Sequence, residues 1–290
     1  MNNCVYILSY GRPHNVKTHR LLTRQAPKAQ LRLVLSDDDE TIPQYEAEFG
    51  AENIRLFSRE QYTRKPFDTG VPKDQRHRKG VVHARNAVYD IAAHDGVEAF
   101  VMLDDDYQKI YVSEDGHVSH KVKDLHSMLQ NTMRIHEQMP KRVAIIAYAQ
   151  SGDMISGWQQ RLSDSGNVWR KAMNFFFCRT DRRVIFKGMT NEDVAAYTSE
   201  KVTTGQQVFL TFANACIWQV ATQQQAGGLT GEYLDTGTYV KTMHSVVRNP
   251  TGVKLHTIHG YNPRGEKGYS RIHHKVVARN TYPKIVRESV

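Results

Sequence analysis

The sequence predicts an α/β fold in which helices cover both faces of a mostly parallel sheet. In the first half, short apolar runs typical of buried strands alternate with segments of helical periodicity. Two of these runs, residues 31–36 and 99–103, are each followed at once by three aspartates. A chain of 290 residues is also long enough to bury a full core. We therefore expect one large domain over residues 1–290.

The first half justifies this class element by element. The turn after the first strand, at residues 10–13, contains no good helix former, and the segment from 58 to 79 is polar, basic and too irregular for a simple connector. Asp37 and Glu40 have capping-box spacing for the helix that follows. The predicted elements are strands at residues 4–9, 31–36, 53–57 and 99–103, and helices at residues 15–25, 45–49 and 81–94.

The second half has a different character, with longer polar and glycine-rich segments between its apolar runs. Residues 260–270 contain three glycines and a proline with little to bury, which predicts a flexible flap. The predicted elements are strands at residues 143–149, 174–178, 184–186 and 208–218, and helices at residues 191–201 and 236–247.

The acidic triplet Asp104, Asp105 and Asp106 is the most informative stretch of the chain. In open α/β sheets, ligands bind in the crevice beyond the carboxyl ends of the strands, and hard divalent cations prefer clustered carboxylate oxygens. One interpretation is a metal site that holds an anionic ligand; the other is a solvated acidic turn that caps the next element. A second acidic strand end at Asp37 favours the ligand crevice.

The charge of the chain is unevenly distributed. Of the net charge of +9, residues 241–290 contribute +8, from ten Lys or Arg against Glu266 and Glu288. This concentration suggests a polyanionic partner such as nucleic acid, or an anionic membrane surface. A basic C-terminal stretch is also explained as an ordinary solubilising surface. The three cysteines are far apart and form no metal-like pair, and no segment approaches membrane-spanning length. We expect a soluble, cytoplasmic protein with reduced thiols and no membrane partner.

The motif at residues 83–86, His-Ala-Arg-Asn, precedes the acidic triplet by about one helix and one strand. Order and spacing resemble the nucleotide-sugar glycosyltransferases of the GT-A fold, whose sheet is Rossmann-like. The resemblance implies that Ser9, Tyr10, Gly11 and Arg12 hold the uridine of a UDP-sugar together with Asp37. It also implies that Arg85 meets the diphosphate. A dinucleotide-binding protein is a poor alternative, because the first strand lacks the glycine fingerprint.

The acidic triplet acquires separate roles from the same resemblance. Asp104 and Asp106 would hold Mn²⁺ or Mg²⁺, with Asp104 also close to the donor, and Asp105 would meet a neighbouring sugar or ribose hydroxyl. A late histidine often completes the metal shell in such enzymes, so His273 is a candidate ligand, and His256 is its alternative. These histidines are also explained by a surface that faces a polyanion.

Residues 191–193, Asn-Glu-Asp, match an acidic element that faces the acceptor in many GT-A transferases. A carboxylate of Glu192 or Asp193 could take the proton from an attacking hydroxyl. The same residues are explained by a helix start, with Asn191 as the cap and the acids favoured by the helix dipole. Both interpretations can hold together.

Four further segments, at residues 225–233, 237–242, 271–275 and 282–286, resemble the TET-associated glycosyltransferases of phages and kinetoplastids, the latter of base J type. The resemblance implies a nucleotide-sugar-binding half at residues 1–112 and an acceptor-binding half at residues 113–290. The implied activity is the metal-dependent transfer of a sugar from a UDP-sugar to the hydroxymethyl group of 5-hydroxymethylcytosine or 5-hydroxymethyluracil in DNA. For a phage protein, this reaction would take place in the cytoplasm of the infected host.

An acceptor base in DNA would have to leave the helical stack, and aromatic residues Trp158, Trp169 and Tyr261 could stack on it or simply pack. Lys and Arg of the C-terminal stretch would meet DNA phosphates, in single or double strands. Two alternatives stay open: a GT-A enzyme that acts on a polysaccharide or protein, and a non-catalytic DNA-binding protein with a transferase-like fold.

Overall fold

The computed structural model describes residues 4–65, 80–113, 120–150, 171–173, 175–219, 230–261 and 267–281. The strands are β1 (Cys4–Leu8), β2 (Gln30–Ser36), β3 (Ile54–Phe57), β4 (Ala99–Asp104), β5 (Tyr107–Val112), β6 (His120–Lys121), β7 (Val143–Gln150), β8 (Phe175–Arg179), β9 (Val208–Gln219), β10 (Val253–Tyr261) and β11 (Lys267–Val276). The α-helices are α1 (Lys17–Gln25), α2 (Ile42–Phe49), α3 (Arg59–Arg64), α4 (Val81–His94), α5 (Leu125–Gln138), α7 (Glu192–Tyr197), α8 (Glu200–Thr203), α9 (Thr230–Arg248) and α10 (Ala278–Thr281). Short 3-10 turns are η1 (Pro13–Asn15), η2 (Ala51–Asn53) and η5 (Thr180–Arg182).

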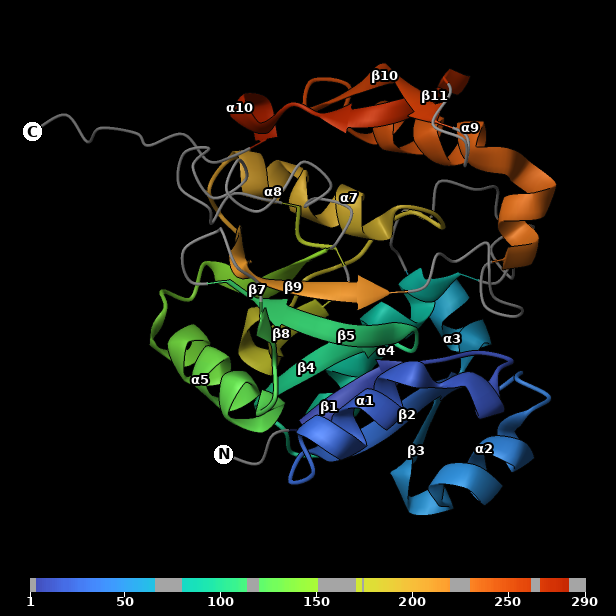
Figure 1. Cartoon of the computed structure of the whole chain (residues 1–290), viewed down its shortest axis with the longest axis vertical. Coiled ribbons are helices and arrows are strands. Elements are labelled where there is room, and N and C mark those ends of the chain that lie inside the picture. Colours follow the sequence, from blue (N-terminus) through green and yellow to red (C-terminus); the bar gives the residue numbers. More distant parts are fainter. Residues whose placement is uncertain are drawn as a thin grey trace, which may run out of the picture.

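The predicted α/β class with a mostly parallel sheet is confirmed (Figure 1). Within the described residues, the central sheet has nine strands in the order β3-β2-β1-β4-β8-β7-β9-β5-β6. Its parallel pairs are β3 with β2, β2 with β1, β1 with β4, and β7 with β9. Because β8 and β5 join their neighbours in antiparallel fashion, they are the two strands that run against the other seven.

The strand order places a topological switch point between β1 and β4. From β1 the chain winds outward to β2 and β3, then returns through α4 to place β4 on the other side of β1. The register pairs Leu8 with Asp104, so the segments that follow β1 and β4 leave the sheet side by side. The crevice at such a point is where open α/β sheets bind ligands.

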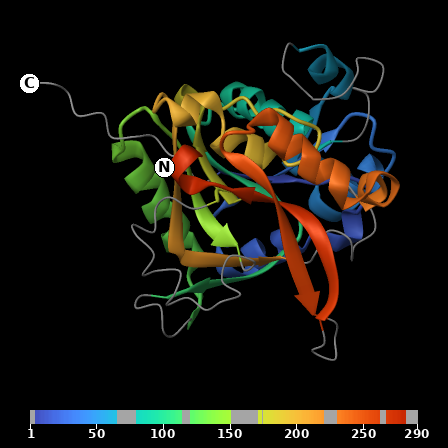
Figure 2. The ribbon, with the colours of Figure 1, turned by 90° about the horizontal axis from the view of Figure 1, so that it is seen from above.

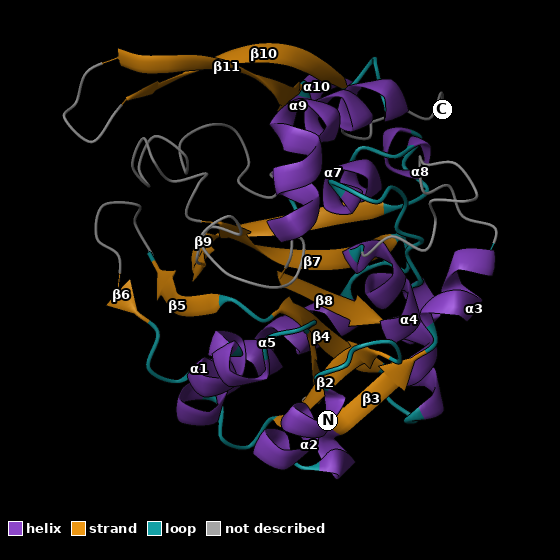
Figure 3. Ribbon diagram, turned by 90° about the vertical axis from the view of Figure 1, so that its right-hand side faces the viewer, coloured by secondary structure: helices purple, strands orange, loops and turns teal. Residues whose placement is uncertain are grey.

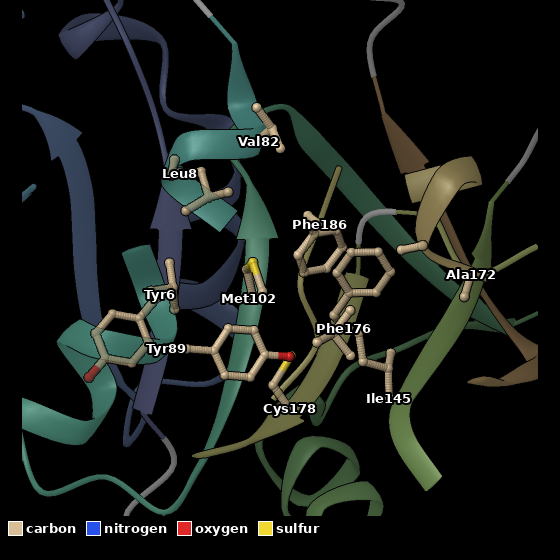
Figure 4. Close-up of a cluster of buried hydrophobic side chains, with 14 of the residues drawn as sticks. Tyr6, Leu8, Val82, Tyr89, Met102, Ile145, Ala172, Phe176, Cys178 and Phe186 are labelled. Carbon is tan, nitrogen blue, oxygen red and sulfur yellow. The ribbon is translucent and has the colours of Figure 1, made fainter. Parts of the chain in front are cut away.

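Helices cover both faces of the sheet because the strand residues alternate between two cores. Tyr6 and Leu8 pack with α4, whereas Val5 and Ile7 pack with α1 and α5. On the α4 face, the Phe100 ring meets the Tyr6 and Tyr89 rings edge to face at 5.6 and 5.3 Å. Figure 4 shows part of this first core. Each core includes residues from strands on both sides of β1.

A further layer lies beyond α7 and α8. The strands β10 and β11 form an antiparallel hairpin that packs against α9, and both lie over the end of the sheet that carries β7 and β9 (Figures 1 and 2). The predicted helix at residues 236–247 is confirmed as part of α9. The basic C-terminal stretch therefore contributes a helix and a two-stranded ribbon.

Residues 184–186 were expected to form a strand, and this expectation is wrong. In the segment after η5, Val184 and Phe186 are buried and Ile185 is exposed, and the segment pairs with no strand among the described residues. Its backbone is satisfied by the Asn86 side chain instead: the Phe186 amide donates to Asn86 Oδ1 at 3.0 Å, and Asn86 Nδ2 donates to the Phe186 carbonyl at 3.0 Å. An apolar run cannot reveal that a distant amide will take the place of a sheet neighbour.

The predicted helix at residues 191–201 is also only partly correct. It is divided into α7 and α8 at Thr198, whose hydroxyl donates back to the Val194 carbonyl at 2.6 Å. Such local bonding by threonine competes with a continuous helix. Ser199 then precedes α8 as its N-cap residue.

The flexible flap predicted at residues 260–270 is wrong for the part that the structure describes. Gly260 pairs with Tyr269 and His259 pairs with Ser270, so the segment continues the β10–β11 hairpin on both sides of residues 262–266, which lie outside the description. Polar, exposed strands of this kind lack the apolar alternation on which strand prediction depends.

The capping box predicted from Asp37 and Glu40 does not form. Helix α2 begins at Ile42 with no side-chain cap, and the Asp37 carboxylate instead accepts the Arg59 amide at 3.0 Å. Asp39 takes the local role, because its Oδ1 accepts the amide and hydroxyl of Thr41 at 2.9 and 2.7 Å. Part of the polar segment 58–79 is also regular, as α3, while residues 66–79 lie outside the description.

Sequence reasoning passed over α5 and the pair β5–β6. The helix α5 buries Leu125, Leu129 and Met133 against the second core, and β5 follows the acidic turn directly.

In the segments described, no helix combines the length and apolarity that crossing a bilayer would require.

Candidate functional site

The acidic turn after β4 and the segment after β1 are joined through Asp105. Ser9 Oγ donates to Asp105 Oδ2 at 2.5 Å, and Arg12 Nη1 lies 3.2 Å from Asp105 Oδ1. Helix α1 also contacts the backbone of this turn, because the Thr18 hydroxyl donates to the Asp104 carbonyl at 2.6 Å. The structure thus brings the predicted residues Ser9, Arg12, Asp104 and Asp105 together at the switch point.

The three carboxylates of the turn differ in their surroundings. Asp105 and Asp106 are buried, whereas the Asp104 side chain is 26% exposed. Burial raises the pKa of Asp105 to about 6. Burial, together with the charges of Asp104 and Asp105, raises the pKa of Asp106 to about 8. Negative charge is crowded here, and a cation bound at the turn would relieve it.

The oxygen ligands that Mg²⁺ or Mn²⁺ prefers are therefore present at Asp104 and Asp106. A third protein ligand is not assembled with them: no group of three or more His, Cys, Asp or Glu is arranged for a metal among the residues that the structure describes. The donor set fits a hard cation that keeps water or substrate oxygens in its remaining positions.

Arg85 lies at the centre of the site. Its side chain is 2% exposed, its Nε donates to Glu192 Oε1 at 2.7 Å, and its Nη2 lies 3.1 Å from Asp104 Oδ1. The guanidinium also lies over the rings of Phe176 and Phe186, at 5.2 and 5.8 Å from their centroids. Burial disfavours its charge, but Asp104 and Glu192 raise the pKa of Arg85 so that it stays a cation.

One nitrogen of Arg85 is left over. Its Nη1 is buried and has no hydrogen-bond partner within the described ranges. A buried guanidinium N–H without a partner costs free energy, and an anionic oxygen is the natural acceptor for it. Asn86, the next residue, positions Phe186 through the paired amide bonds described above.

Glu192 and Asp193 begin α7 in different environments. Glu192 is buried and bonded to Arg85, whereas Asp193 is partly exposed and accepts the Val194 amide at 2.8 Å. Burial and the neighbouring Glu192 carboxylate raise the pKa of Asp193 above its ordinary range, against the opposite effects of Arg85 and Lys241. A carboxyl group whose pKa is closer to neutrality is better matched to proton transfer near pH 7.

Asn191 fixes the start of α7 in an unexpected way. Its φ is 52°, and it is the one non-glycine residue with a positive φ in the described part of the chain. Instead of capping α7, its side chain donates to Ser245 Oγ at 2.7 Å and to the Lys241 carbonyl at 3.1 Å, both on α9. The cap predicted from the sequence is therefore wrong for Asn191, which ties the acidic pair to α9.

Two histidines of β11, His273 and His274, lie next to Asn191. The His273 and His274 rings are 4.4 Å apart, His274 Nδ1 is 3.5 Å from Asn191 Nδ2, and β10 places His256 opposite His273. Burial lowers the pKa of His273. The pKa of His274 is lowered to about 3, mainly by burial and to a smaller extent by the charge of His273. The structure does not gather His273 with Asp104 and Asp106, so its role as a metal ligand stays a prediction.

The segment after β1 also meets the ends of β2 and β3. The Gly11 amide donates to Asp39 Oδ2 at 2.8 Å, and the Tyr10 ring lies 5.1 Å from the Arg59 guanidinium. Arg59 is buried and pairs with Asp38 at 2.8 Å, while its backbone amide is held by Asp37. Tyr10, Gly11 and Asp37 therefore lie close together beyond the carboxyl ends of β1 and β2.

Several site residues were missed from the sequence. Arg59 and Asp39 line the β1 side, Thr18 holds the acidic turn, and Lys241 lies near Asp193. Asp39 carried a signal as part of the second acidic triplet, and Lys241 lies in the segment at residues 237–242 that resembles the family. The others reach the site through tertiary contacts that have no local pattern. Trp158 and Trp169 lie outside the described residues, and Tyr261 is the last residue of β10.

Comparison with solved structures shows weak overall likenesses. TarS (residues 1–349) from S. aureus is 12% identical, with a TM-score of 0.41 over 86% of this chain and 65% of that one. A putative nucleotide-diphospho-sugar transferase from Desulfovibrio desulfuricans G20 is 11% identical, with a TM-score of 0.37 over 86% and 97%. This chain thus spans just under two thirds of the TarS structure, and a search of curated proteins gave no match.

The fold is an α/β fold whose candidate site lies at the switch point of the central sheet. The family assignment is direct: the model of the TET-associated glycosyltransferases matches residues 4–228, and the chain belongs to that family. The match covers the β1 segment, Arg85, the acidic turn and Glu192–Asp193, but not the β10–β11 hairpin.

Proposed function

We propose that this protein transfers a sugar from a UDP-sugar to the hydroxymethyl oxygen of a modified pyrimidine in DNA, 5-hydroxymethylcytosine or 5-hydroxymethyluracil. The observation that carries the proposal is the position of Arg85, bonded to Asp104 on one side and to Glu192 on the other, in a chain of the TET-associated family. This single side chain connects the donor side of the crevice with the acceptor side.

The donor would lie along the carboxyl edge of β1, β2 and β4. Tyr10 and Arg59 offer a ring and a guanidinium to the uracil, and Asp37 and the Ser9–Arg12 segment border the same side. Asp105 is engaged with Ser9 and Arg12, so it shapes this wall and can exchange those contacts for a ribose hydroxyl. Arg85 Nη1 would donate to a diphosphate oxygen.

Asp104 and Asp106 would hold Mg²⁺ or Mn²⁺, which fits their hard oxygen atoms and the raised pKa of Asp106. When bound, the cation would neutralise charge on the diphosphate as it leaves. The protein contributes the Arg85 cation, fixed by Glu192 and by two aromatic rings, so no rearrangement is needed to present it.

The proton of the attacking hydroxymethyl group needs an acceptor if the reaction inverts the sugar configuration. Asp193 is the better base of the two candidates, because it is partly exposed and its pKa is raised. Glu192 is buried and occupied by Arg85, which suits a positioning residue. If the reaction retains configuration, attack from the leaving-group face needs no protein base.

The basic side chains around α9 and β11 support a DNA acceptor. Lys171, Lys241 and Arg271 are near enough to His273 to lower its pKa, and Lys241 acts on Asp193 in the same sense. Cations in this position can meet phosphates that flank a base turned out of the stack. The same features are compatible with an anionic polysaccharide or protein acceptor, which is the second candidate.

The test is mass spectrometry of nucleosides from hydroxymethylated and plain DNA after incubation with protein, Mn²⁺ and a panel of UDP-sugars. The proposal predicts a hexose or pentose mass added only to hydroxymethylated DNA. Asp104→Asn should abolish the product, whereas Asp181→Asn, a control at a carboxylate of η5 with a 43% exposed side chain, should not.

Two outcomes would redirect the proposal. Donor consumption with no mass added to any DNA, but with transfer to polysaccharide or protein, would assign the second candidate acceptor. DNA binding with no metal-dependent turnover of any UDP-sugar would favour a non-catalytic DNA-binding role. If the Asp104→Asn variant still forms the product, the reaction does not need the acidic turn, and the proposed site is refuted.

A further inference from the structure

A basic cavity of about 450 Å³ lies between α1 and the strands β5 and β6, apart from the residues assigned to the donor. Five of its nine lining residues are Lys or Arg, and no Asp or Glu lines it within the described ranges. The lining residues are Lys17, Arg20, Leu21, Arg24, Gln25, Tyr107, Gln108, Lys109 and Lys121.

One wall of the cavity is a face of α1. Lys17, Arg20 and Arg24 are spaced by three and four residues, which places them within roughly 60° of one another around the helix axis. Leu22, on another side of the same helix, is buried in the second core. Since the core fixes the rotation of α1, the three cations are held toward the cavity.

The opposite wall is the edge of the sheet. Lys109 lies on β5 and Lys121 on β6, and both side chains are exposed. No ion pair joins Arg24, Lys109 or Lys121 to a carboxylate in the portion of the chain that is described, and Arg20 donates to the His14 carbonyl. Converging cations repel one another, so an anion is the complementary ligand.

The extent of the cation row favours a polyanion over a single phosphate. At about 1.5 Å per residue, Lys17 and Arg24 are separated by about 10 Å along the helix axis. Each strand of DNA carries a phosphate about every 3.4 Å along its axis, so this row spans about three phosphates. A lone phosphate could engage only a part of the five side chains.

We propose that this cavity binds the phosphate backbone of the DNA acceptor, which rests on the proposed function. The cavity is linked directly to the acidic turn: the Tyr107 amide donates to Thr18 Oγ1 at 3.0 Å, and that hydroxyl donates to the Asp104 carbonyl. Figure 3 shows α1, the β5–β6 edge and the free end of the β10–β11 hairpin on one side of the molecule. The acceptor would thus meet two separate basic surfaces, this cavity and the β10–β11 hairpin.

The test compares a cavity variant, Arg24→Gln/Lys109→Gln/Lys121→Gln, with a control, Arg134→Gln/Lys141→Gln/Lys201→Gln. All six side chains are exposed, and the control residues lie outside the cavity. Fluorescence anisotropy with labelled double-stranded DNA, as a function of KCl, measures the slope of log K against log salt. Loss of three phosphate contacts should make the slope shallower by about 2.7, and affinity at 0.1 M KCl should fall about tenfold or more.

Kinetics separate binding from chemistry. For the cavity variant, the KM for hydroxymethylated DNA should rise with kcat retained, while hydrolysis of the UDP-sugar should equal that of wild type. A wild-type salt slope in the cavity variant, or an equal loss in the control, would overturn the cavity's role even where the wild-type protein glycosylates DNA. Absence of transfer by the wild-type protein itself would instead refute the proposed function.

Discussion

Replacing Arg85 by methionine should destabilise the protein more than any surface change of equal size. Methionine keeps an apolar stem of similar length but removes the guanidinium that is 2% exposed and bonded to Glu192 and Asp104. Glu192, whose side chain is 6% exposed, would then be a buried carboxylate without its cation. Breaking a buried pair in this way costs about 3–5 kcal/mol, mostly because one charge is left uncompensated.

The expected shift in Tm follows from the length of the chain. With about 2.1 cal/mol/K of unfolding entropy per residue, a domain of 290 residues has roughly 0.6 kcal/mol/K, so the loss corresponds to about 5–8 °C. Glu192→Gln keeps an acceptor for Arg85 and should cost about 1–2 kcal/mol. In the double variant the buried charge is gone, and the total should be about 2 kcal/mol less than the sum of the single losses.

Calorimetry or denaturant unfolding of the four proteins, without metal or donor, measures this cycle. Arg64→Met is the matched control, because Arg64 and Glu60 form an ion pair with side chains 75% and 72% exposed, and its effect should stay within about 0.5 kcal/mol. A loss below about 1 kcal/mol for Arg85→Met, or strictly additive effects with Glu192→Gln, would refute the argument that the pair is a buried electrostatic unit.

Three further predictions concern metal, backbone and pH. Because the pKa of Asp106 is raised to about 8, Mg²⁺ or Mn²⁺ should displace close to one proton at pH 7 and bind about tenfold more weakly at pH 6, and calorimetry in buffers of different ionisation enthalpy should detect that proton. Asn191→Ala should be less stable than Asn191→Gly by about 1 kcal/mol in urea, since both lose the bonds to α9 but only alanine strains the left-handed φ; the reverse order would contradict this. Burial lowers the pKa of His136 to about 4, so this histidine gains a proton below pH 6.5 in the unfolded protein but not in the folded one. The free energy of unfolding should therefore fall by about 2 kcal/mol between pH 7 and 5. Denaturant titrations should show a weaker dependence of this free energy on pH in His136→Gln.

Local pattern was sufficient to predict the strands β1 to β4. Apolar runs delimit β1, β2, β3 and β4, and the acidic strand ends at Asp37 and Asp104 lie at the same edge of the sheet, as parallel strands require. These features depend on a residue and its immediate neighbours. Arg85 lies beside Asp104, and its contact with a diphosphate stays a prediction.

Elements that depend on distant partners could not be predicted in this way. The 184–186 segment gives its backbone bonds to Asn86, about a hundred residues earlier, and the helix at 191–201 is divided where Thr198 bonds back to Val194. The hairpin β10–β11 is paired along its length but largely polar and exposed, so periodicity gave no signal. The Asn86 bonds and the hairpin pairing involve residues distant in the sequence, whereas the Thr198 bond is local and leaves no mark on the apolar periodicity.

The acidic triplet shows where the limit of sequence reasoning lies within a single motif. Three identical side chains in succession carry no sign of their separate roles, because the chain turns between them. Asp104 ends β4 and is bonded to Arg85. Asp105 is bonded to Ser9 and Arg12. Asp106 is buried, and the negative charges of Asp104 and Asp105 add to the rise of its pKa. Their different environments, rather than their number, make one a partner of the buried cation and another the link to the β1 segment.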